Sequence, residues 1–320
     1  MMTANARKIL VGFILATIVL MVPTGCGVAG SALVKIGLER KYEPDGVARA
    51  KEEMDRRCPG LKAWIDSMYA AGAMRDTIIV RDGYKLHSTF APAEQPSGRT
   101  AVIMHGYSAN PVYMMHIARM YRDSLGYNIW LPSARRHGES EGAAVQMGWL
   151  DRFDLLDWSA VAHEYFGDTL QVYHGVSMGA AAVMNTSGEE TPDYVRGFVE
   201  DCGFTNLWDA AHRFVEKNYN LSADTLLDEV DTRISRQYGW SLRENSCVDQ
   251  LAKCSKPMLF IHGEDDQFVP PDMIIWNFQA KVHGYREMWV APGSRHARSF
   301  SDHPAEYTAI VRRFLKEQVE

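Results

Sequence analysis

The sequence lacks the patterns that mark several large classes of protein. Its 320 residues contain no Cys-x-x-Cys pair and no His-Glu-x-x-His motif, so we expect no metal site. Basic residues number 34 against 40 acidic ones, and the net charge of −6 argues against a nucleic-acid partner. No repeat or low-complexity segment is present. The composition is that of an ordinary globular protein, long enough for one large α/β domain.

Charge is also missing from the start of the chain, where no charged residue occurs from Ile9 to Val34. Arg7 and Lys8 precede this segment, and a basic start followed by an apolar run is typical of a secretory signal. The uncharged span also exceeds the roughly 20 residues that cross a bilayer. We therefore expect residues 1–30 to be a signal peptide or a membrane anchor.

Three forms of export stay open. A signal peptide could be cleaved near Ala29, the segment could be retained as an anchor, or Cys26 could carry a lipid. Thr24-Gly25-Cys26 resembles the end of a bacterial lipoprotein site, although Pro23 stands where leucine is usual. We expect an exported bacterial protein that is membrane-anchored, a lipoprotein, or secreted or periplasmic. A buried N-terminal helix is the remaining alternative.

The other four cysteines are Cys58, Cys202, Cys247 and Cys254. Their even number permits disulfides in an exported protein. Cys202 and Cys254 belong to segments that should run close together. Buried free thiols are nevertheless the more frequent outcome, and we expect them here.

From residue 77 onward, short apolar runs alternate with helical patterns. Asp82-Gly83 between two strand-like segments predicts a β-hairpin. The apolar runs that follow cover 101–104, 128–131, 170–173, 195–199, 258–261 and 287–290, and the helical patterns cover 113–124, 150–166, 178–185, 271–282 and 304–319. This alternation predicts a mostly parallel sheet with helices on both faces.

One interval is too long for a simple loop. More than fifty residues, rich in helix formers and aromatics, separate the runs 195–199 and 258–261. A structureless loop of that length is uncommon in a compact domain, so we expect a helical cap. The aromatic residues Trp208, Phe214 and Trp240 either line an acyl pocket beneath this cap or pack the cap onto the domain.

The sharpest motif is Gly175-Val176-Ser177-Met178-Gly179, which lies between a strand pattern and a helix of small residues. Gly-x-Ser-x-Gly in this context is typical of a nucleophile elbow. The glycines leave room where the strand and helix pass closely, and the helix N-terminus favours developing negative charge. We predict that Ser177 is a nucleophile; a serine in a tight structural turn is the alternative.

A serine nucleophile needs a histidine base that a carboxylate orients. After an elbow of this type the acid comes next in the chain and the histidine last. Glu264, Asp265 and Asp266 follow the apolar run 258–261 and compete for the role of the acid. His296 precedes the last helix and is the expected base, whereas His303 stands before Pro304 at a helix start, where a solvent or capping role is expected.

An oxyanion hole needs two backbone N–H groups. Met178, directly after the nucleophile, supplies one. The loop after the run 101–104 reads His105-Gly106-Tyr107, and we expect Tyr107 N–H to be the second donor because Gly106 lets the backbone approach. His105 is expected to support this loop rather than to act as a base.

From about residue 77 to 318 the chain resembles the α/β-hydrolase family. Five motifs carry the resemblance: His105-Gly106-Tyr107, 136–142, 175–179, His262-Gly263-x-x-Asp266-x-x-Val269-Pro270 and 293–297. The fourth motif selects Asp266 over its two rivals. One departure is that residues 133–138 read Ser-Ala-Arg-Arg-His-Gly where the family often has Asp-x-Arg-Gly-His-Gly. This change bears on the substrate, since Arg135 and Arg136 either neutralise nearby acids or meet an anionic substrate.

The resemblance implies an α/β-hydrolase fold with a mostly parallel eight-stranded sheet, helices on both faces and a small helical cap. The expected organisation is an export segment (1–30), a helical extension (31–76), a first core part (77–203), the cap (204–256) and a second core part (257–320). The implied function is a serine hydrolase that cleaves a small acyl ester with Ser177, Asp266 and His296, without a cofactor or a protein partner. A serine peptidase of the aminopeptidase or prolyl-oligopeptidase kind is the alternative, followed by a thioesterase or an inactive anchored binding protein.

Overall fold

The computed structural model describes residues 26–39, 43, 45–219 and 223–320. Most of the predicted export segment, residues 1–25, lies outside them, as does the Cys26 side chain. No helix formed by the described residues has both the length and the apolar character needed to cross a membrane.

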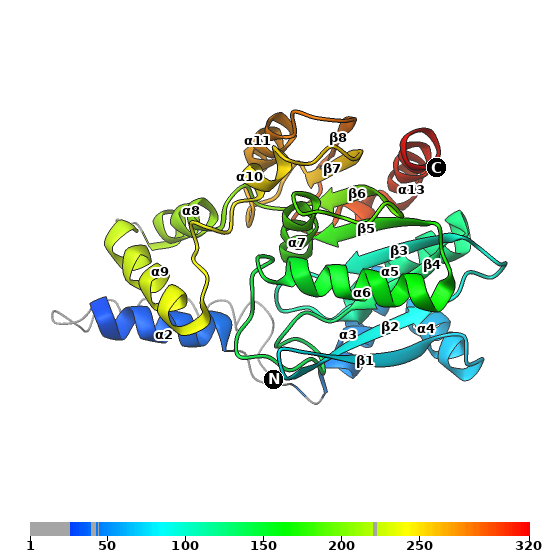
Figure 1. Ribbon diagram of the computed structural model, residues 1–320, viewed down its shortest axis with the longest axis horizontal. Coiled ribbons are helices and arrows are strands. Elements are labelled where there is room, and N and C mark those ends of the chain that lie inside the picture. The colour runs from blue at the N-terminus through cyan, green and yellow to red at the C-terminus, as the bar shows by residue number, and fades with distance from the viewer. Residues whose placement is uncertain (1–25, 40–42, 44, 220–222) are drawn as a thin grey trace.

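Eight strands form one sheet in the order β1-β2-β4-β3-β5-β6-β7-β8 (Figure 1). The β1–β2 and β2–β4 pairs are antiparallel and all later pairs are parallel. The strands are β1 (Arg75–Arg81), β2 (Tyr84–Ala91), β3 (Arg99–Met104), β4 (Asn128–Pro132), β5 (Leu170–Val176), β6 (Val195–Asp201), β7 (Met258–Gly263) and β8 (Arg286–Ala291). The predicted mostly parallel sheet, opening with a hairpin at Asp82-Gly83, is confirmed.

Helices cover both faces of the sheet, so its central strands are buried on both sides. Val102 of β3 belongs to one buried cluster and its neighbour Ile103 to the other. The first cluster includes α6 (Asp151–Phe166), α7 (Met178–Ser187), α10 (Cys247–Leu251) and α11 (Asp272–Ala280). The second includes α3 (Gly46–Arg57), α4 (Leu61–Ala70), α5 (Met115–Arg119) and α13 (Pro304–Phe314).

The predicted helix over 113–124 has the right position but is not continuous. A 3₁₀ turn η1 (Pro111–Met114), the helix α5 and a π turn η2 (Met120–Ser124) share this segment. The Asn110 side chain accepts a hydrogen bond from Val112 N at 3.0 Å, which caps the first turn. The helix predicted over 304–319 is likewise divided, because α13 ends at Phe314 and a π turn, η3 (Leu315–Val319), follows it. A short helix, α12 (Ser299–Asp302), precedes α13.

The long interval between β6 and β7 contains α8 (Leu207–Tyr219) and α9 (Asp224–Tyr238), which project away from the sheet (Figure 1). The N-terminal helix α2 (Cys26–Leu38) runs beside α9 (Figure 1). Val34 and Leu38 of α2 share a buried cluster with Leu227 and Ile234 of α9. The expected boundary at residue 30 therefore falls inside a helix that packs on α9.

All four cysteines outside the N-terminal segment are free thiols, and Cys202, Cys247 and Cys254 are buried. This is the arrangement expected from the sequence. The cysteines act as small apolar residues of the core.

Candidate active site

Ser177 occupies a strained turn between β5 and α7. Its φ of 59° and ψ of −117° lie where side chains are rare. A Cβ on Gly175 would lie 2.1 Å from Gly179 O, and one on Gly179 would lie 2.2 Å from Met104 O. Only glycine fits at both positions, so the motif keeps strand and helix close while Ser177 N donates to Asp201 O at 2.8 Å.

A chain of hydrogen bonds joins Ser177, His296 and Asp266. His296 Nε2 lies 2.8 Å from Ser177 Oγ, and His296 Nδ1 lies 2.6 Å from Asp266 Oδ2. A carboxylate only accepts hydrogen bonds, so Nδ1 carries the ring proton and Nε2 is left to accept the hydroxyl proton. The three residues come from loops that follow β5, β7 and β8, which end at the same edge of the sheet.

Asp266 is held as an ionised carboxylate. Its Oδ1 accepts hydrogen bonds from Phe268 N at 2.8 Å and Val269 N at 3.0 Å. Burial alone would raise the pKa of Asp266, but hydrogen bonds from His262 and His296 outweigh it and hold the pKa well below the ordinary value. Its sequence rivals Glu264 and Asp265 are exposed, and Glu264 instead accepts from Gly293 N at 2.8 Å.

The structure gives His262 a role that the sequence analysis did not assign. Its Nε2 donates to Val269 O at 3.1 Å and lies 3.3 Å from Asp266 Oδ2. His262 thus fixes both the carboxylate and the loop that presents it. The buried Glu200 of β6 would raise the pKa of His262 when ionised, but burial raises the pKa of Glu200 itself to about 8, so Glu200 is mostly neutral near pH 7.

The expected oxyanion donors flank Ser177 on two sides. Met178 opens α7, and Tyr107 follows Gly106, where a Cβ would lie 3.2 Å from Ser177 Cβ. Ser108 N donates to His137 Nε2 at 3.2 Å. His137, which belongs to the motif 136–142, thus supports the loop 105–108.

The two other histidines considered from the sequence support the backbone. His105 Nε2 accepts from Ala134 N at 3.0 Å, and its Nδ1 donates to Gly106 O at 2.8 Å. His303 Nε2 donates to Pro292 O at 2.8 Å. Both side chains have hydrogen-bonding roles in loops around the site.

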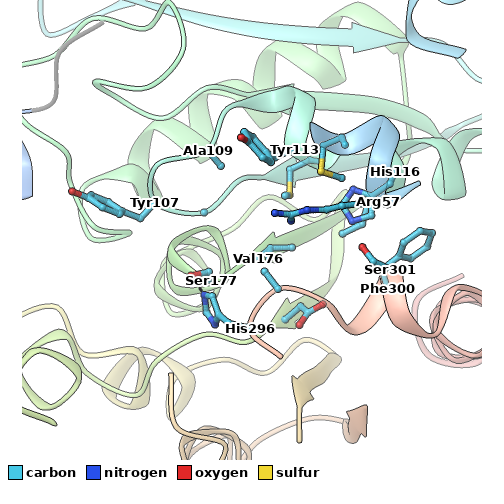
Figure 2. Close-up of a pocket in the computed structure, with 16 residues that line it drawn as sticks. Arg57, Tyr107, Ala109, Tyr113, His116, Val176, Ser177, His296, Phe300 and Ser301 are labelled. Carbon is cyan, nitrogen blue, oxygen red and sulfur yellow. Dashed lines mark hydrogen bonds between the residues drawn. The ribbon is translucent and has the colours of Figure 1, made fainter. Parts of the chain in front are cut away.

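A cavity of about 120 Å³ opens beside Ser177 (Figure 2). Its walls come from α3, the loop after β3, the η1–α5 segment, the elbow and α12. The apolar lining includes Met54, Met114, Ile117, Val176 and Phe300, and the polar lining includes Arg57, Tyr113, His116, Ser177 and Ser301. Helix α3 belongs to the segment that the sequence analysis treated only as an extension.

The sequence held a signal for this wall. Ala50 and Met54 are spaced four residues apart and are buried, which marks one face of α3 as part of the core. Arg57 comes three residues after Met54 and therefore lies on nearly the same face. What the sequence could not indicate is that this face ends beside Ser177.

The three aromatic residues that could either line an acyl pocket or pack the cap onto the domain lie outside this cavity. Trp240 is 1% exposed within the core, and the Trp208 ring lies 3.2 Å beneath the Arg243 guanidinium. Phe214 packs edge-on against Phe268 at 6.1 Å between ring centroids. The Phe268 ring is in turn 5.0 Å from that of His296, so Phe214 stands at the rim of the site.

Among the described residues, Cys202, Asp266 and His296 offer three potential metal-ligating atoms within 4.8 Å of one another. Burial raises the pKa of the Cys202 thiol well above its ordinary value, so it stays protonated and is a poor metal ligand. The other two side chains bond to each other. The cluster fits a hydrogen-bonded acid–base pair better than a metal centre.

Known proteins resemble the chain mainly in fold. No family model matches the sequence. An uncharacterised Bacillus subtilis protein, YqkD, is 28% identical over 226 residues, which is 70% of this chain and 73% of its own. The esterase Pf2001 of Pyrococcus furiosus superposes with a TM-score of 0.62 at 21% identity, covering 77% of this chain and 92% of its own. The Pyrococcus horikoshii acylaminoacyl peptidase superposes with a TM-score of 0.57 at 16% identity, covering 77% and 41%.

Proposed function

We propose that this chain, which has the α/β-hydrolase fold that its motifs predicted, is a serine hydrolase that cleaves carboxylic esters. The observation that carries the proposal is the hydrogen-bonded chain from Ser177 through His296 to Asp266. A serine hydroxyl is a poor nucleophile until a base removes its proton, and this geometry supplies the base.

In the proposed reaction, Ser177 Oγ attacks the ester carbonyl carbon while His296 Nε2 takes its proton. The imidazolium then protonates the leaving alcohol, and an acyl-enzyme remains on Ser177. Water attacks the acyl carbon with His296 again as the base, which releases the acid. Asp266 keeps His296 in the required tautomer and stabilises its cation, a role that its lowered pKa supports.

Negative charge develops on the carbonyl oxygen in both steps. The backbone N–H groups of Tyr107 and Met178 are the proposed donors to this oxygen, and each such donor is worth about 10²–10³ in rate. The close approach of Gly106 to Ser177 supports the assignment of the first donor.

Ester cleavage is favoured over peptide cleavage by the extent of the likeness. The match to the esterase covers 92% of that chain, whereas the match to the peptidase covers 41% of its length. The additional part of the peptidase has no counterpart in this likeness. Peptide cleavage is therefore the alternative that the following test distinguishes from ester cleavage.

The test compares the full chain with a Ser177→Ala variant on p-nitrophenyl esters of increasing acyl length and on an aminoacyl p-nitroanilide. Serine-dependent ester hydrolysis that exceeds anilide hydrolysis is the expected result. Faster serine-dependent anilide cleavage would replace the proposal with a peptidase. Failure of a fluorophosphonate to label Ser177, together with absent hydrolysis, would reject a serine hydrolase.

We also propose that the protein is exported, on the basis of Arg7, Lys8 and the uncharged segment that follows. Fractionation of bacteria that express the full chain tests this. If the protein is exported, its esterase activity is expected in the cell-envelope fraction or in the medium. Release of a Cys26→Ala variant from the membrane would identify lipid attachment, and retention would identify an anchor.

A further inference from the structure

We propose that Arg57 binds a carboxylate of the substrate, so that the preferred esters carry an anionic group on the part that enters the cavity beside Ser177. This inference rests on the proposed ester hydrolysis and specifies its substrate class. The inference is based on the observation that the Arg57 guanidinium and the proposed nucleophile Ser177 line the same cavity.

Arg57 is the last residue of α3, and its side chain extends into the cavity (Figure 2). The guanidinium lies between the segment of Tyr113 and the elbow that holds Val176 and Ser177 (Figure 2). A third of the side chain is exposed, so a ligand can reach it. Ser177 lines the same cavity, and a substrate bound there meets both groups.

The guanidinium is held in place by a neighbour outside the cavity lining. Glu53, one turn earlier on α3, forms an ion pair with Arg57 Nη2. The second carboxylate oxygen of Glu53 accepts from Tyr113 OH at 2.8 Å. Arginine offers five N–H donors in a planar fork, and in the described part of the chain Glu53 is the one hydrogen-bonding partner of this group. Donors therefore remain for a ligand carboxylate.

The other ionisable groups of the cavity leave this positive charge in place. His116 is buried, and burial, reinforced by the charge of Arg57, lowers its pKa to about 3, so the ring is neutral. Asp201 also lines the cavity, but its two oxygens accept from Ser299 at 3.2 Å and Tyr307 at 3.1 Å. Burial raises the pKa of Asp201 to about 6, so the carboxylate is still mostly ionised near neutral pH, but both of its oxygens are engaged by these two hydrogen bonds.

Arg135, one of the two arginines singled out from the sequence, serves a different purpose. Arg135 is buried and donates to Asp154 at 2.7 Å through Nε and Nη2, with a further bond to Asp82. Neither Arg135 nor Arg136 lines the cavity. Arg57 is the arginine that a substrate at Ser177 would meet.

The remaining walls define the rest of the ligand. Met54, Met114, Ile117 and Phe300 give the cavity an apolar lining, and apolar surroundings strengthen an ion pair. An aliphatic chain suits these walls. The inferred substrate is an ester with a carboxylate a few methylene groups from the scissile bond.

Matched ester pairs test the inference. For the acyl side, the p-nitrophenyl hemiester of glutaric acid is compared with p-nitrophenyl pentanoate. For the alcohol side, 4-acetoxybenzoate is compared with its methyl ester. The readout is the ratio of kcat/KM for the anionic ester to that for the neutral ester, which a general loss of activity does not change. The pair that shows the preference identifies the half of the substrate that enters the cavity.

Arg57→Gln is expected to lower this ratio about 10- to 100-fold, the range for a lost hydrogen bond to a charged group. Arg57→Lys should restore part of it, since lysine keeps the charge but not the fork. Arg56→Gln is the matched control, because Arg56 is exposed on the same helix and does not line the cavity, and should leave the ratio unchanged.

Equal ratios for the wild type and Arg57→Gln in both pairs would overturn the inference while leaving ester hydrolysis intact. Absence of serine-dependent hydrolysis of every ester would instead reject the proposed function. In that case the binding of a carboxylate by Arg57 is tested by comparing the rates at which Ser177 reacts with a carboxylate-bearing and with a neutral alkyl fluorophosphonate. A preference for the anionic reagent that Arg57→Gln removes would support it, and equal rates would reject it.

Discussion

The hydroxyl group of Tyr107 donates a hydrogen bond to the backbone carbonyl of Gly37 at 2.8 Å. Tyr107 stands in the loop that approaches Ser177, and Gly37 belongs to α2, which packs on α9. One hydrogen bond thus connects the N-terminal helix to the proposed oxyanion hole. The N-terminal helix is thereby part of the scaffold around the site.

Tyr107→Phe should lower kcat about two- to tenfold, which corresponds to one hydrogen bond, because the loop loses its tie to α2. KM should change little, since the cavity walls stay in place. Steady-state kinetics on a short-chain p-nitrophenyl ester measure the effect. Tyr285→Phe, which removes an exposed hydroxyl on the far edge of the sheet, is the control. An unchanged kcat in Tyr107→Phe would show that the tie does not position the loop.

Leu38→Ala should destabilise the protein by about 2–4 kcal/mol, the cost of removing a buried leucine side chain. Leu38 is 6% exposed and belongs to the cluster between α2 and α9. Urea unfolding followed by circular dichroism measures the change, with Ile36→Ala, a 40% exposed residue of the same helix, as the control. Equal effects of the two variants would mean that α2 does not pack as described.

Asp266→Asn should lower kcat about 10⁴-fold, because an amide cannot hold His296 in the required tautomer. Asp265→Asn is the matched control, since Asp265 is exposed, and should change kcat less than twofold, within about 0.5 kcal/mol. Burst kinetics would locate the loss in the chemical steps. A large loss in Asp265→Asn with little in Asp266→Asn would exchange the two roles.

Glu200→Gln should stabilise the protein at high pH. Burial raises the pKa of Glu200 to about 8, against ~4.3 in an unfolded chain. The folded state therefore holds this proton more tightly, and the stability it contributes at low pH is lost as the pH rises through about 8. Glutamine carries no charge, so the Tm of the variant should rise relative to wild type from pH 5 to pH 9, by roughly 2–6 °C.

Scanning fluorimetry across that pH range checks this, with the exposed Glu190→Gln as the control. A gap in Tm that stays constant with pH would mean that Glu200 is not buried as a neutral acid.

The sequence by itself determined the fold class and the elbow. A tight turn restricts its residues within a few positions, so the glycines at 175 and 179 were enough to predict the local geometry around Ser177. The alternation of apolar runs and helical patterns was enough to predict the sheet, because burial on both faces demands it.

Only the tertiary structure decided which residues surround the serine. Arg57 precedes Ser177 by 120 positions, and Gly37 precedes Tyr107 by 70, so no local pattern relates the members of either pair. Trp208 and Trp240 are residues of the kind that often line an acyl pocket, yet Trp240 packs in the core and Trp208 packs against Arg243. A cavity is bounded by side chains that long-range packing brings together, and that packing depends on the shape of the whole core rather than on any one segment.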